Sequence, residues 1–248
     1  GPIHVGSMRE ILTADAVARA VRDAGGEAEL VYVADTADPL RKVYPFLDES
    51  YAEWVGHPLA EIPAPEGDGS YADHFLEPFF DALREVGVAP RVVDNHAAYR
   101  EGRFADCTRA AVENAAGARE ILERVSGRQL PRDWFPWTCR DSDGRLVNGR
   151  VTECKWPILE FENAAGEIVQ NNLAKGEGKL PWRLDWPAKW SWLGVSFEAF
   201  GKDHATRGGS FDTGREIIEA IYGGSAPDHL VYEWIHLKDS GAMHSSTG

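Results

Sequence analysis

The apolar positions at the start of the chain recur mostly with the period of a helix. They run from Met8 to Val21 and predict a helix with one buried face. Ser7 is followed three residues later by Glu10, the pattern of a capping box, so we expect the helix to begin at Ser7. A pair of glycines at 25–26 is expected to end it.

A short apolar run comes next, and a polar loop follows it. The run at 28–34 is rich in Val and predicts a buried parallel strand, which leads into the polar segment 35–39. Helix, strand and polar loop, in this order after the glycine-containing turn 1–6, are typical of one half of a Rossmann-type unit. We expect such a unit to have a further strand before residue 1.

Helical and strand-like patterns of apolar residues recur further along the chain, and the segment in the middle has a different composition. Helices are expected at 75–86, 104–126 and 211–222, and strands at 91–93, 194–198 and 230–235. Between 130 and 181 the chain is rich in Trp, Gly, Asn and Asp and shows short alternating runs, which predicts an inserted, mostly β segment. We therefore expect an α/β fold with a Rossmann-type parallel sheet. Its first half would span 1–129 and its second half 182–248.

Composition excludes several classes of protein. The 43% hydrophobic and 27% charged residues are typical of a folded globular chain, and no apolar run approaches the ~20 residues of a membrane span. The net charge of −14 argues against a nucleic-acid backbone as the main partner, unless a local patch binds it. Three cysteines without framework spacing favour a reducing compartment, so we expect a cytoplasmic protein with no membrane partner.

The segment His4-Val5-Gly6-Ser7 stands at the start of the first predicted helix. A helix N-terminus offers N–H donors and a partial positive charge, both of which attract phosphate. A glycine lets a nucleotide approach the backbone, and a histidine can donate a hydrogen bond to a phosphate oxygen. An ordinary Gly/Pro turn with a surface histidine would show the same pattern, so this segment alone leaves both interpretations open.

Two later segments have the chemistry of a nucleotide site. In Gly201-Lys202-Asp203-His204 the aspartate follows a predicted strand and could accept both ribose hydroxyls, while the glycines at 208–209 would leave room for a purine. The third segment, 242–246, reads Ala-Met-His-Ser-Ser and follows the last predicted strand. Taken singly, each also fits a solvated turn.

Together the three segments have the order and spacing of one family. The chain resembles the class I lysyl-tRNA synthetases: His4–Ser7 is similar to their HIGH motif, and Met243 and Ser246 match their KMSKS loop. The resemblance covers essentially the whole chain. Further stretches that carry it lie at 33–43, 71–75, 178–190 and 231–235. It implies a Rossmann (HUP-like) catalytic domain, an inserted acceptor-end subdomain at 130–181, and a helical anticodon-binding domain that this chain does not contain.

The resemblance also implies roles in ATP binding and catalysis. His4 and Gly6 would contact the ATP phosphates, Asp203 the ribose, and Gly208, Gly209 and Ser210 the adenosine. Met243, Ser245 and Ser246 would belong to the mobile loop over ATP. Ala242 and Ser245 replace the two lysines of that loop, so we expect His244 or Lys238 to supply the missing positive charge, with His244 catalytic. The nucleotide is expected to enter with Mg²⁺.

For the amino acid, the resemblance implies an aromatic and histidine pocket. Trp182, His204 and Tyr232 match its positions, and Gly1 would contact the backbone end of the substrate lysine. An ammonium over such rings gains ~0.5–2 kcal/mol. Asp35, or alternatively Asp38, is the carboxylate expected to pair with the ammonium, because both follow a strand end. Core packing remains an alternative for the aromatic residues, and Trp54, Trp134 and Trp137 could be core or a tRNA surface.

The cysteines depart from the family pattern. Relatives often carry paired Cys-x-x-Cys knuckles in the insert, whereas here Ser142 stands where the partner of Cys139 would be, and Cys154 is alone. We therefore expect the insert to fold without structural zinc.

Three functions remain open from the sequence. The first is ATP-dependent activation of L-lysine and its transfer to tRNA(Lys) by a monomeric enzyme. The second is a lysine-activating paralogue that serves a non-tRNA acceptor. The third is a lysine- or nucleotide-binding module without turnover, which the altered loop would explain.

Overall fold

The structure is a computed structural model that describes residues 3–233 and 235. The first parallel pair joins β1 (Val31–Ala34) to β2 (Arg91–Asp94) in register, with Ala34 opposite Asp94. Helix α1 (Val5–Asp23) precedes β1, and α2 (Tyr71–Glu85) precedes β2. Ile11 of α1 and Phe79 of α2 bury their side chains in one small core beside these strands.

A second parallel pair forms near the other end of the chain. Strand β9 (Phe197–Gly201) pairs with β10 (Asp228–Tyr232), and Gly201 lies opposite Tyr232. Helix α6 (Trp182–Leu193) precedes β9. Between the two strands lie α7 (Ser210–Ile217) and a π-helical turn, η3 (Ile218–Tyr222). The α/β class is confirmed. Within the described residues the parallel strands form two pairs, β1–β2 and β9–β10.

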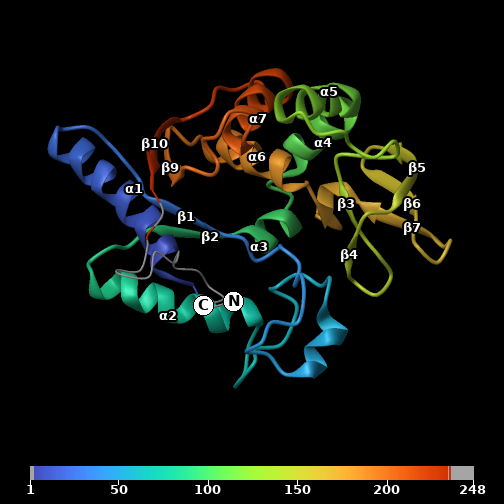
Figure 1. Ribbon diagram of the computed structural model, residues 1–248, viewed down its shortest axis with the longest axis horizontal. Coiled ribbons are helices and arrows are strands. Elements are labelled where there is room, and N and C mark those ends of the chain that lie inside the picture. Colours follow the sequence, from blue (N-terminus) through green and yellow to red (C-terminus); the bar gives the residue numbers. More distant parts are fainter. Residues whose placement is uncertain (1–2, 234, 236–248) are drawn as a thin grey trace.

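The middle of the chain begins with helices and continues as short antiparallel strands. The helices are α3 (Asn95–Arg100), α4 (Ala105–Glu113) and α5 (Ala115–Ser126), and the strands are β3 (Thr138–Arg140), β4 (Leu146–Val147), β5 (Arg150–Lys155), β6 (Ile158–Glu162), β7 (Ile168–Asn172) and β8 (Gly178–Lys179). The strands form two three-stranded sheets, in the orders β4-β3-β8 and β5-β6-β7. Figure 1 shows them at one end of the molecule, next to α4 and α5. The mostly β character expected of this segment is therefore present.

This β segment shares its core with the helices on either side. Leu159 and Leu180 pack in the same buried cluster as Phe104 of α4's N-terminus and Leu184 of α6. Because one apolar core crosses both expected boundaries, the division at 129/130 and 181/182 stays a prediction.

Two local expectations are wrong. Ser7 does not cap α1: the cap is His4, whose side chain accepts from the Gly6 N–H, so the helix begins at Val5. The helix expected at 104–126 is broken at Asn114, whose side-chain amide donates to the Ala110 carbonyl at 2.8 Å. Asn favours such local side-chain bonds over a continuous helix.

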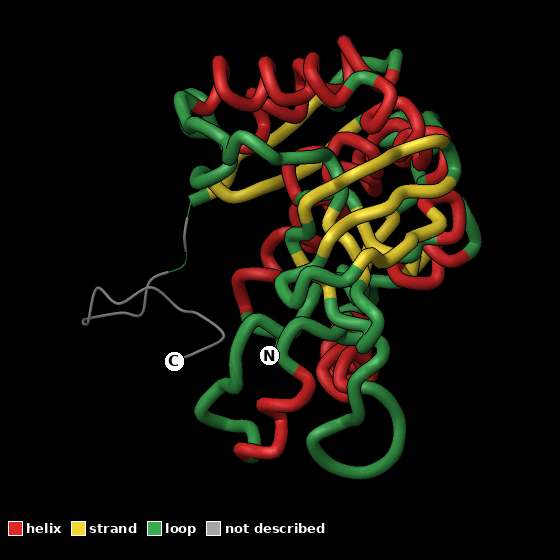
Figure 2. Tube along the Cα trace, turned by 90° about the vertical axis from the view of Figure 1, so that its right-hand side faces the viewer, coloured by secondary structure: helices red, strands yellow, loops and turns green. Residues whose placement is uncertain are grey.

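The remaining elements were shifted in position or not anticipated. The expected strand at 28–34 is β1, which begins three residues later and ends where expected, and β9 and β10 are displaced by two or three residues. Helices α3 and α6 and the 3₁₀ turns η1 (Glu49–Trp54) and η2 (Leu173–Lys175) were not anticipated. The loops between β1 and α2, which carry η1, extend at the lower end of Figures 1 and 2. No helix within the described ranges is long and apolar enough to cross a membrane.

Candidate functional site

The N-terminus of α1 is organised around His4. Its Nδ1 accepts the Gly6 backbone N–H at 3.0 Å, so a neutral His4 ring carries its proton on Nε2. A Cβ on Gly6 would stand 2.6 Å from His4 Cε1, which only glycine avoids while this cap is kept. The two residues predicted to contact ATP phosphates thus form one unit, with a donor nitrogen on the histidine and helix N–H groups beside it.

The predicted aromatic pocket is assembled in part at the start of α6. Trp182 stacks on Trp186 with ring centroids 5.3 Å apart and planes 11° apart, and the His204 ring lies 5.9 Å from Trp182 and 5.3 Å from Trp186. Trp182 is 42% exposed, so it is no core residue. The structure therefore brings two of the predicted lysine-binding side chains, Trp182 and His204, together on an open surface.

Tyr232 joins the same region through the end of β9. A Cβ built on Gly201 would lie 2.5 Å from Asp203 Oδ1 and 3.7 Å from Tyr232 Cε2, which places all three residues side by side. Asp203 in turn lies 3.5 Å from the His204 Nε2. The predicted ribose ligand, Asp203, and the predicted lysine-binding residues His204 and Tyr232 therefore lie at the carboxyl ends of β9 and β10, where ligands of parallel sheets bind.

Glu10 was not predicted from the sequence and lies beside Tyr232. The Tyr232 hydroxyl donates to Glu10 Oε2 at 3.3 Å, across 222 positions of sequence. The Glu10 side chain is exposed to solvent at one end of this contact. Desolvation around the carboxyl group, followed by the negative charge of Glu198, raises the pKa of Glu10 to about 7. Asp35 and Asp203 act in the same direction. A carboxylate destabilised in this way, by desolvation and by like charges, is suited to receive an ammonium ion.

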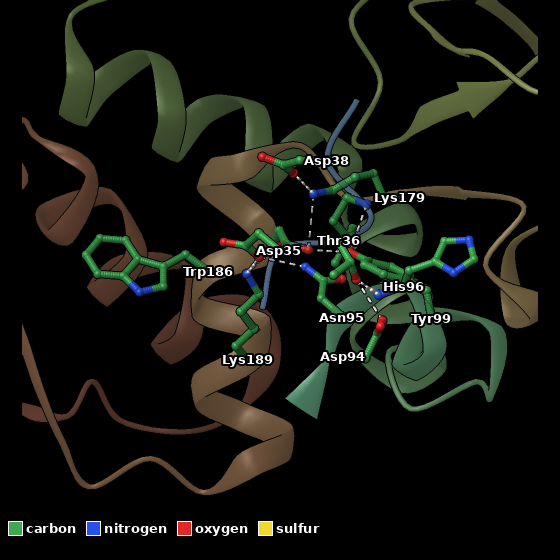
Figure 3. A network of polar contacts seen from close by, with 12 residues as sticks. Asp35, Thr36, Asp38, Asp94, Asn95, His96, Tyr99, Lys179, Trp186 and Lys189 are labelled. Carbon is green, nitrogen blue, oxygen red and sulfur yellow. Dashed lines mark hydrogen bonds and ion pairs between the residues drawn. The ribbon is translucent and has the colours of Figure 1, made fainter. Parts of the chain in front are cut away.

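Asp35 follows β1 as predicted, but a cation of the chain itself already contacts it. Asn95 donates to Asp35 Oδ1 at 2.7 Å, and the Lys189 ammonium of α6 also bonds to that oxygen. Burial alone would raise the pKa of Asp35, but the Lys189 and Lys179 ammonium groups outweigh it and lower the pKa. Figure 3 shows Asp35 between these residues. Asp38, the alternative candidate, bonds to Lys179 instead.

The predicted adenosine residues lie at the N-terminus of α7. Gly208 has φ +73°, and a Cβ there would stand 2.6 Å from the Val125 carbonyl oxygen. Gly209 caps α7, and Ser210, its first residue, is buried. Position 208 needs a glycine because the chain's own backbone at Val125 comes so close to it. The glycine is therefore explained without a nucleotide, and its contact with adenosine stays a prediction.

The other predicted site residues fall outside the described part of the chain. They are Gly1, Lys238, Ala242, Met243, His244, Ser245 and Ser246. The mobile-loop roles and the charge substitution expected of His244 or Lys238 therefore stay predictions.

Sequence reasoning missed the charged groups that surround these residues. Lys179, Asp185, Lys189 and Glu198 were assigned no role, and Glu10 only a place in the expected capping box. One signal was available: Asp185 and Lys189 stand four residues apart among Trp and Ala, and charged residues are rarely buried in such a helix unless they pair.

The cysteines are free thiols. Cys107 and Cys139 are buried, Cys154 is half-buried, and burial raises the pKa of Cys139 to about 12. Within the described ranges, no group of three or more His, Cys, Asp or Glu residues is arranged to hold a metal ion. Folding of the insert without structural zinc stays a prediction.

Known proteins match the chain along its whole length. The family model for class I tRNA synthetases (K) matches residues 1–248. Lysine–tRNA ligase 1 of Methanosarcina acetivorans is 48% identical over 100% of this chain and 47% of its own length. The lysine–tRNA ligases of Thermoplasma volcanium and Archaeoglobus fulgidus are 46% and 45% identical, again over 100% of this chain, and 50% of each of them is covered. The chain thus spans about half the length of the curated relatives it matches.

Proposed function

The chain belongs to the family of class I tRNA synthetases (K), and on that premise we propose that it activates L-lysine with ATP and transfers it to tRNA(Lys). The carboxylate of lysine attacks the α-phosphate of ATP, pyrophosphate leaves, and lysyl-adenylate forms. The terminal hydroxyl of the tRNA then attacks the carbonyl carbon of the adenylate, and AMP leaves. Catalysis consists of positioning and of stabilising the charge on the transferring phosphate.

One observation carries the proposal of lysine as substrate. The aromatic and histidine side chains at the carboxyl ends of β9 and β10 are accompanied by carboxylates, of which Glu10 contacts Tyr232 directly. Such a site suits a substrate whose side chain has a long apolar stem and a cationic end. Since Asp35 is paired with Lys189, we propose Glu10 as the carboxylate for the substrate ammonium.

The nucleotide would lie between α1 and the β9–α7 loop. His4, with its proton on Nε2, would donate to a phosphate oxygen, and the N–H groups of the first turn of α1 would complete the anion site. Asp203 would hold the ribose. Mg²⁺ would arrive with ATP as part of the substrate. We also propose that the protein acts as a monomer. A cytoplasmic location is proposed as well, because three free cysteines favour a reducing compartment.

Pyrophosphate exchange tests the proposal. The full protein is incubated with ATP, labelled pyrophosphate and each amino acid in turn, and then with tRNA. Exchange that depends on lysine, followed by lysylation of tRNA(Lys), is the expected result. Exchange without tRNA charging would support an enzyme with another acceptor, and binding of lysine without exchange would support a module that lacks turnover.

A further inference from the structure

Three charged side chains beneath the candidate site are almost completely buried. The side chains of Lys179, Asp185 and Lys189 are 7%, 1% and 7% exposed. Lys189 Nζ lies 2.9 Å from Asp185 Oδ2, and Lys179 Nζ lies 4.0 Å from Asp185 Oδ1. Burying ammonium and carboxylate groups is costly unless each is paired, so these three charges depend on one another.

The row of charges continues to the end of β1. Lys179 bonds to Asp38 and Lys189 bonds to Asp35, so five side chains alternate in sign from one side of the loop after β1 to the other. Figure 3 shows both lysines directed toward this loop. We call this set, Asp38–Lys179–Asp185–Lys189–Asp35, the charge row.

Neutral donors complete the charge row. The Tyr99 hydroxyl donates to Asp185 Oδ1 at 2.6 Å and accepts the Leu180 N–H at 3.1 Å. The Asn95 amide donates to Asp35. The carboxylates of the two central pairs, the buried Asp185 and the more exposed Asp35, therefore each have a neutral hydrogen-bond donor besides a lysine.

The charge row acts on the helix that carries Trp182. Helix α6 begins at Trp182 after Pro181 and has no side-chain cap at its N-terminus. Lys189 lies two turns further along the same helix, and its Nζ is 5.9 Å from the centre of the Trp182 ring. The Lys189 ammonium thus contacts both the Asp35 carboxylate, just after β1, and the exposed Trp182 indole, and so fixes the distance between these two groups.

We propose that Lys189 is a positioning residue for lysine activation, which fixes Asp35 and the Trp182 indole as one rigid wall of the amino-acid pocket. The inference rests on the proposed function. It assigns Asp35 to Lys189 rather than to the substrate, so that Asp35 acts through this lysine and Glu10 receives the substrate ammonium.

The test compares Lys189→Met and Lys189→Arg in the full protein, with Lys155→Met as the control because Lys155 forms an exposed pair with Glu153. In lysine-dependent exchange, we expect Lys189→Met to raise the KM for lysine by about tenfold or more, with kcat and the KM for ATP nearly unchanged. Lys189→Arg should restore part of the affinity. A fall in kcat in proportion to the folded fraction, at unchanged KM for lysine, would overturn the inference.

A double-mutant cycle separates the two roles of Asp35. If Asp35 acts through Lys189, Asp35→Asn combined with Lys189→Met should be no worse than the more damaging single variant. Additive losses would mean that Asp35 meets the substrate itself, and would refute the assignment.

Near-ultraviolet circular dichroism decides the structural part without any activity. The signal of the Trp182–Trp186 stack is obtained by subtracting the spectrum of Trp182→Phe from that of the unmodified protein. We expect folded Lys189→Met to lose this signal and folded Asp35→Asn to weaken it. An intact stack in folded Lys189→Met would overturn the inference, whereas absence of lysine-dependent exchange in the unmodified protein would overturn the proposed function instead.

Discussion

Glu10 gives the sharpest prediction on substrate selection, because its ionisation changes near neutral pH. Its pKa is raised to about 7, whereas the substrate ammonium has a pKa of ~10.4 and stays charged throughout the range from pH 6 to pH 8. Only the ionised carboxylate attracts the ammonium. Lysine binding by the free enzyme should therefore strengthen as pH rises through 7.

The magnitude follows from the fraction of Glu10 that is ionised. With a pKa of about 7, roughly one tenth is ionised at pH 6 and roughly nine tenths at pH 8. Since kcat/KM reports the free enzyme, kcat/KM for lysine should rise about ninefold over this range. Glu10→Gln keeps the shape of the side chain and removes the charge. A hydrogen bond to a charged group contributes ~1.5–3 kcal/mol, so the variant should lose about tenfold to hundredfold in kcat/KM.

The assay is pyrophosphate exchange at subsaturating lysine across pH 6 to 8. Glu10→Gln should give a low and flat profile, and kcat/KM for ATP should change little. Glu113→Gln, which removes a charge from an exposed pair with Arg109, is the control and should keep the wild-type profile. If Glu10→Gln retained the ninefold rise, the titrating group would lie elsewhere and the assignment of Glu10 to the ammonium would be wrong.

Four further predictions concern the fold and the two subsites. Tyr99→Phe should lower the free energy of unfolding by about 2–4 kcal/mol in a urea titration, because it removes a donor from Asp185 and the acceptor of the buried Leu180 N–H. Tyr222→Phe loses one hydrogen bond to a carbonyl and should cost about 1 kcal/mol in the same titration. Equal losses in the two variants would refute the argument. His4→Ala should slow adenylate formation much more than it weakens lysine binding in a fluorescence titration, since its bond strengthens as phosphate charge moves. Gly6→Ala should displace the His4 ring and reproduce this defect in exchange kinetics; normal kinetics would separate the two residues. Trp182→Ala should raise the KM for lysine by about twofold to thirtyfold, and an unchanged KM in a folded variant would remove Trp182 from the pocket.

Much of the local structure could be predicted from the sequence because it depends on near neighbours. The periods of apolar residues located α1, α2, β1 and β2, and the left-handed Gly127 ends α5 where a helix end was expected. The order of the motifs indicated the family, which the matches over all 248 residues confirm. Local rules failed where two possible caps competed. Ser7 was the expected cap of α1, but the His4 imidazole, three residues earlier in the chain, accepts the Gly6 N–H and caps the helix instead.

The candidate site depended on contacts that no local pattern contains. Asp35 was placed correctly at the end of a strand, but its partner Lys189 stands 154 positions away, and Glu10 meets Tyr232 across 222 positions. Periodicity indicates which residues share a face of one element, yet it cannot tell which faces of distant elements meet. Burial then decides the chemistry. Asp35 holds an internal cation because Lys189 is folded against it, whereas Glu10 stands among like charges and is the carboxylate that we propose for the substrate cation.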